Sequence, residues 1–109
     1  MNAPLTLEVN LYGSTYTVWP ELLTYGNDRL AVCFNCDEGP FGVLTVNMPN
    51  DHLNDGEVFV KDWSEGEPLF KACLDAGWIK LTGREVMSGY VAPKVATLAG
   101  PLAELADRR

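Results

Sequence analysis

The feature that most constrains this fold is a succession of short strand-like segments separated by turn residues. Residues 5–11 alternate apolar and polar side chains, which is the period of a half-buried strand. Gly13 and Ser14 are typical of a turn, so residues 5–11 and 15–19 predict a hairpin. Pro20 is expected to end or bend the second strand of this hairpin. Further strands are expected at residues 29–34, 41–47 and 57–61.

One main helix is expected after these strands. Ser64 and Glu67 have the spacing of a capping box, and Gly77 is the expected left-handed stop. The helix is therefore predicted over residues 65–76. Its apolar residues recur at helical spacing and form one stripe, made of Leu69, Phe70, Cys73, Leu74 and Ala76.

The remaining residues complete the expected architecture. A strand is predicted at residues 78–81, a break at residues 82–84, an extended segment at residues 90–98, and a short helix from Gly100. This order favours an α+β fold, in which an antiparallel β-sheet of four to six strands has the main α-helix packed on one face and carries a short C-terminal helix. The length of 109 residues fits a single domain, 1–109.

Charge is distributed unevenly along the chain. Residues 37–67 contain eight acids and one base, Lys61, whereas the acids and bases of the other residues cancel. The net charge of −7 therefore arises from this segment alone. Such a field repels nucleic acid and attracts a basic partner. The simpler interpretation, which stays open, is a solvated acidic surface that maintains solubility.

The sequence contains no recognisable catalytic motif, so we expect a protein that is not an enzyme and that binds no cofactor. Cys33 and Cys36 form a CxxC pair that, with Cys73 and His52, could supply a zinc site. The pair sits at odd separation on an expected strand, and Cys73 lies on the apolar stripe of the helix. We therefore expect three free thiols that are not metal ligands, and an exposed loop histidine.

A partner-binding face is predicted from the acidic segment. Trp63 falls between an expected strand and the helix start, where it either folds back as a hydrophobic staple or anchors a partner. Arg84 is the best candidate for a buried or interfacial ion-pairing group, because its planar fork suits a carboxylate. The predicted partner-binding residues are Asp51, Asp55, Glu57, Asp62, Trp63, Glu65 and Glu67.

Several segments of the second half carry a family resemblance. LTVNMP at residues 44–49 and EVFVKD at residues 57–62 precede the helix that ends at Gly77, and TGR at residues 82–84 and SGY at residues 88–90 follow. In this order they resemble an uncharacterised domain-of-unknown-function family of small acidic proteins carried on plasmids, phages and conjugative elements. The resemblance implies a mobile-element context and no specific activity.

Together, the charge and the resemblance favour a cytoplasmic protein-binding module. It would inhibit a host defence nuclease complex, as an anti-CRISPR or antirestriction protein, by presenting a nucleic-acid-mimicking face to a basic surface. Direct binding of nucleic acid or membrane is not expected, since no basic stripe, signal peptide or membrane span is recognisable. The alternatives are a nucleotide-binding or nucleotide-degrading counter-defence protein, with a loop-built pocket around Arg84, Tyr90 and Lys94, and a plasmid housekeeping protein.

Overall fold

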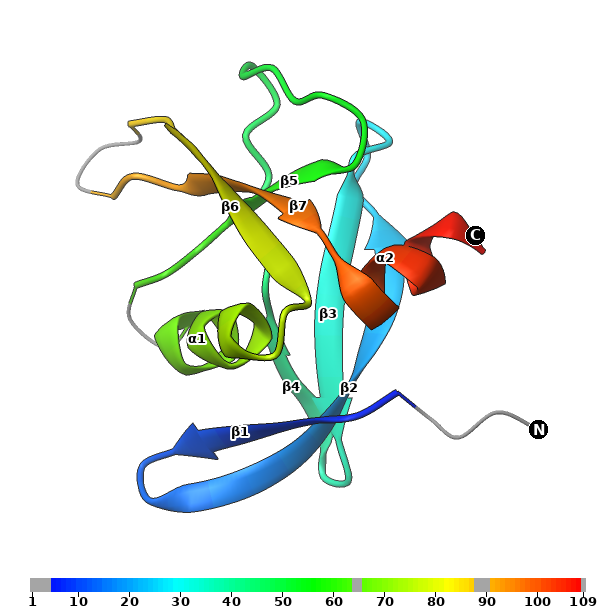
Figure 1. Cartoon of the computed structure of the whole chain (residues 1–109), viewed down its shortest axis with the longest axis vertical. Coiled ribbons are helices and arrows are strands. Elements are labelled where there is room, and N and C mark those ends of the chain that lie inside the picture. Colours follow the sequence, from blue (N-terminus) through cyan, green and yellow to red (C-terminus); the bar gives the residue numbers. More distant parts are fainter. Residues whose placement is uncertain (1–4, 64–65, 88–90, 109) are drawn as a thin grey trace.

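The computed structural model describes residues 5–63, 66–87 and 91–108. These residues form two antiparallel sheets and two helices (Figure 1). The elements in chain order are β1 (Leu7–Leu11), β2 (Ser14–Thr24), β3 (Leu30–Cys36), β4 (Gly39–Val43), β5 (Glu57–Val60), α1 (Glu67–Asp75), β6 (Ile79–Glu85), β7 (Lys94–Leu98) and α2 (Gly100–Asp107).

The first sheet has the order β1-β2-β3-β4 and is built from consecutive hairpins. Of the two effects expected of Pro20, an end of the second strand is not found, because the strand continues to Thr24. The first half of β2 pairs with β1, and the half that contains Pro20 pairs with β3. Because that half has a partner strand on one side only, a residue without an N–H is tolerated there.

The second sheet has the order β5-β7-β6 and was not anticipated as a separate sheet. The expected strand at residues 41–47 ends early, because β4 stops at Val43 and the chain then turns toward β5. Thr45 forms an isolated antiparallel bridge with Val60, which joins the two sheets. β6 runs through the expected break at residues 82–84, where its pairing with β7 shifts in register between Leu81 and Glu85, so the break is an irregularity inside the strand and not its end.

The main helix α1 begins later than predicted. Its N-cap is Gly66 without a side-chain hydrogen bond, and Glu67 is already its first residue. The predicted capping box is therefore wrong, because it required Glu67 at the third helical position. Ser64, the predicted N-cap, lies outside the described residues. The predicted stop is confirmed, because Gly77 has φ +76° and its N–H donates to the Leu74 carbonyl at 3.1 Å. Trp78 N–H donates to the Cys73 carbonyl at 2.9 Å, which completes a Schellman motif.

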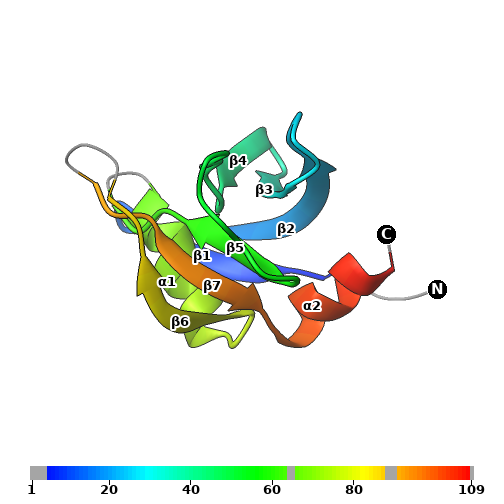
Figure 2. The same cartoon turned by 90° about the horizontal axis from the view of Figure 1, so that it is seen from above.

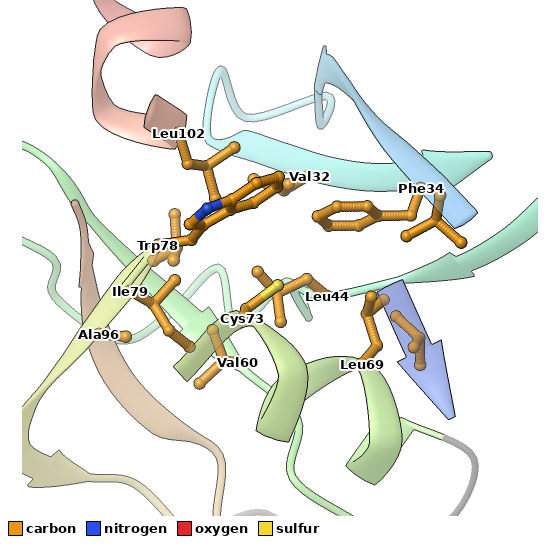
Figure 3. Packing of buried hydrophobic residues seen from close by; sticks show 13 residues of the cluster. Val32, Phe34, Leu44, Val60, Leu69, Cys73, Trp78, Ile79, Ala96 and Leu102 are labelled. Atoms are coloured by element: carbon orange, nitrogen blue, oxygen red, sulfur yellow. The ribbon is translucent and has the colours of Figure 1, made fainter. Parts of the chain in front are cut away.

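One hydrophobic cluster fills the space between the sheets and the helices. Phe34 of β3 stacks on Trp78 with ring centroids 6.3 Å apart, and Leu102 of α2 lies beside the same indole (Figure 3). Leu69 and Cys73 enter the cluster from α1, which packs against β1 and β6. Viewed from above, α1 lies beside β6, and α2 lies beyond the end of β7 (Figure 2). Within the described residues, no helix combines the length and apolar composition that crossing a membrane requires.

Candidate functional site

The acidic segment does not form one continuous face. Asp37 and Glu38 form the turn between β3 and β4, directly after the end of β3. The loop of residues 47–56 contacts Arg29, and Arg29 is the residue directly before the start of β3. Seven residues of strand at roughly 3.3 Å each separate these two ends by about 23 Å. Figure 1 shows the turn at the bottom and the loop at the top of the molecule.

Arg29 fixes one side of this loop. Its guanidinium donates to the carbonyl of Met48 at 2.5 Å and to the carbonyl of Asp51, and it lies 5.9 Å from the ring centroid of Phe59. Asn27 adds a hydrogen bond of 3.1 Å from its side-chain amide to Asn47. The loop backbone is thus tied to the turn between β2 and β3, although nothing in the local sequence connects them.

Arg84 fixes the other side of the loop. Its Nη1 donates to both carboxylate oxygens of Glu57, at 2.8 and 2.9 Å, and its Nη2 donates to the carbonyl of His52 at 3.2 Å. The prediction that Arg84 forms an ion pair is confirmed, but the expectation that it is buried is wrong, because its side chain lies at the surface. The side chain of Glu57 is only 9% exposed, whereas that of Arg84 is 44% exposed. Because Arg84 contacts both Glu57 and the carbonyl of His52, this ion pair holds the loop in place.

Two causes hold the pKa of Glu57 below its ordinary value. The larger is the hydrogen bond that its carboxylate accepts from the backbone N–H of Asn54, at 2.9 Å, and the second is the hydrogen bond from Arg84. A carboxylate whose folded pKa is depressed stabilises the protein above its unfolded pKa, and this contribution is lost as pH falls through the folded value.

We expect Glu57→Gln to lower the melting temperature at pH 7 and to have a progressively smaller effect as the pH falls below the ordinary glutamate value of about 4.5. Calorimetry of both proteins from neutral to acidic pH measures this difference. In an Arg84→Gln background the effect of Glu57→Gln should shrink, because one partner is already gone. A melting difference that does not change with pH would contradict the assignment.

The structure distributes the predicted partner-binding residues over different environments. Glu57 pairs with Arg84, and Asp62 pairs with Lys94 of β7. Asp55 and Glu67 are exposed, while Asp51 and Trp63 are half-buried. Glu65 lies outside the described residues.

A cavity of about 380 Å³ opens beside the loop. Its exposed carboxylates come from three separate places: Asp28 in the turn between β2 and β3, Asp55 in the loop, and Asp107 at the end of α2. We call these three residues the acidic tip. The apolar part of the lining consists of Leu30, Leu53, Val58, Leu98 and Ala106. Sequence reasoning missed Asp28 and Asp107, because each has an arginine as its neighbour in the chain and neither belongs to the acidic segment.

Two of the three cysteines, Cys33 and Cys73, occupy environments unsuited to thiolate chemistry. Cys73 is buried in the core, and burial raises the pKa of its thiol to about 12. Burial, and then the charge of Glu21, raise the pKa of Cys33. Cys36 packs against the core, as do Val32 and Phe34 of the same strand, whereas Cys33 alternates to the other face. Thiols with raised pKa values are protonated at neutral pH and are weak nucleophiles.

The positions of the candidate metal-binding and nucleotide-binding residues support neither kind of site. Across residues 5–63, 66–87 and 91–108, no three His, Cys, Asp or Glu side chains are grouped to hold a metal ion. His52 is exposed, as expected, and its Nε2 lies 2.9 Å from Oδ1 of Asn54. Arg84 and Lys94 pair with different carboxylates, and Tyr90 lies outside the described residues.

Comparison with known proteins found no family model, no curated protein and no solved structure that matches this chain. The resemblance to a mobile-element family therefore stays a prediction.

Proposed function

We propose that the protein is a non-enzymatic, cytoplasmic binding module encoded by a mobile genetic element. In this proposal it inhibits a host defence nuclease complex, as an anti-CRISPR or antirestriction protein, by occupying a basic surface that otherwise binds nucleic acid. The observation that carries the proposal is the acidic tip, where Asp28, Asp55 and Asp107 line a cavity. Its three carboxylates replace the extended face that the sequence had suggested.

The tip is suited to a nucleic-acid-binding partner for two physical reasons. Carboxylates clustered at one end of a molecule steer a cationic surface toward that end and accelerate association. The loop that carries Asp55 is already fixed by Arg29 and Arg84, so that little conformational freedom is lost on binding.

The remaining exposed acids have a different role in this proposal. Asp37 and Glu38 lie at the far end of β3, well beyond the screening length of about 8 Å at physiological ionic strength. They contribute to net charge and solubility but are not expected to touch a partner bound at the tip. Glu57 and Asp62 act mainly through their own ion pairs.

Two variants with the same change in net charge test the proposal. The tip variant carries Asp28→Asn, Asp55→Asn and Asp107→Asn, and the matched variant carries Asp37→Asn, Glu38→Gln and Glu67→Gln. All six positions are exposed, so both variants should fold normally. We expect the wild-type protein and the matched variant to raise phage plaquing or plasmid transformation in a host with an active restriction or CRISPR system. The tip variant should lose most of this effect.

The proposal fails if the wild-type protein protects against none of the defence systems of its native host. It also fails if the two variants lose protection equally, because the effect would then follow total charge. Melting temperatures of both variants provide the control for folding.

A second candidate function is binding of a small molecule, since the cavity volume lies within the range of known ligand pockets. The carboxylates around it repel phosphate groups, which disfavours a nucleotide. A rise in melting temperature with millimolar nucleotide, and none with a basic peptide, would favour this second candidate.

A further inference from the structure

We infer that the cavity at the acidic tip receives an arginine side chain of the partner protein. This inference rests on the proposed function and deepens it, because it names the group that the tip recognises. Among the described residues, four carboxylates and one guanidinium line the cavity. Its charge is therefore complementary to a cation.

The positive and negative groups of the lining are not equally available. Arg29 is turned toward the carbonyls of Met48 and Asp51, and Glu57 is held by Arg84. No side-chain hydrogen bond or ion pair of Asp28, Asp55 or Asp107 is present within the described parts of the chain. These three carboxylates remain exposed to solvent and can accept hydrogen bonds from an incoming donor.

The walls of the cavity point to a cation with an apolar stem. Leu30, Leu53 and Leu98 are half-buried, so they leave apolar surface that a chain of methylene groups can cover. A bare metal ion does not use such surface, and the carboxylates are not grouped closely enough to hold one in the described structure.

Arginine fits this arrangement better than lysine. Its guanidinium is planar, carries five donors and can bridge more than one carboxylate, whereas an ammonium is a compact and strongly hydrated point charge. Arginine is also among the residues that dominate protein–protein binding energy. The adjacent Arg108 of this chain lines a different cavity, with Pro20, Leu22 and Leu105, and does not fill this one.

The probe for this inference is the blocked tripeptide acetyl-glycyl-arginyl-glycine amide, titrated into the isotope-labelled full chain and followed by NMR. We expect shifts of the backbone amides that surround the cavity, with saturation in the millimolar range. The tip variant should bind at least about fivefold more weakly, as expected from the loss of several exposed charge pairs. The matched variant should bind as the wild type does.

Comparison peptides define what would overturn the inference. The citrulline peptide keeps the shape without the charge and should cause no saturable shifts, and the lysine peptide should bind more weakly than the arginine peptide. Equal shifts with lysine would overturn the choice of arginine. Equal loss of binding in both variants, or calcium chloride shifting the same amides, would overturn the cavity as an arginine site.

This experiment is independent of the cellular assay. Arginine binding without any protection against host defence would leave the cavity assigned and would refute the proposed function. Protection that persists in a protein that does not bind the arginine peptide would support the function and refute the inference.

Discussion

Replacing Phe34 with alanine is expected to destabilise the protein by about 3–5 kcal/mol, the usual cost of deleting a buried phenylalanine. Phe34 is 1% exposed and stacks on Trp78, so its removal opens a cavity where β3 meets the start of β6. Natural domains are stable by only about 5–15 kcal/mol, so the variant should be close to unfolding at room temperature. Urea denaturation followed by tryptophan fluorescence measures the change.

Tyr12→Ala is the matched control for this variant. Tyr12 is 93% exposed in the turn between β1 and β2, so deleting its ring should change stability by no more than about 0.5 kcal/mol. If the two alanine variants were equally stable, the packing of Phe34 against Trp78 could not be part of the folded protein in solution.

Leu102→Ala should cost about 2–5 kcal/mol and should also impair the acidic tip. Leu102 is fully buried and attaches α2 to the core beside Trp78. The same helix carries Ala106 and Asp107, which form one wall of the cavity. We therefore expect a lower denaturation midpoint together with weaker binding of the arginine peptide at a temperature where the variant is still folded.

Glu104→Ala is the control on the same helix, because Glu104 is exposed and does not line the cavity. It should leave both stability and peptide binding close to the wild type. Full peptide binding by the folded Leu102→Ala protein would contradict the view that the position of α2 determines the cavity.

Local chemistry explains the sequence predictions that the structure confirms. Gly77 ends α1 because a left-handed residue there lets two N–H groups reach the carbonyls of Leu74 and Cys73. Gly100 and the proline that follows it begin α2, as predicted. The strand segments were placed by the alternation of side chains, and their hairpins by turn residues. Each of these signals spans only a few neighbouring residues.

The sequence predictions that the structure corrects concern segments whose structure depends on residues far away in the chain. Alternation indicates which residues form a strand, but it carries no information about which sheet the strand joins, so β5, β6 and β7 were not recognised as a second sheet. Pro20 lies inside a continuous strand because β2 changes its partner there. The Ser64–Glu67 spacing was a valid local pattern, but α1 begins only at Glu67.

The same distinction applies to the candidate site. By itself the sequence determined the approximate positions of the strands and helices, the excess of acidic residues and the suitability of Arg84 for an ion pair. Only the tertiary structure decided that Arg84 pairs with Glu57, and that Asp28, Asp55 and Asp107 line one cavity. The physical reason is that charge and periodicity are properties of the chain, whereas the grouping of residues 79 positions apart depends on how two sheets and a helix pack together.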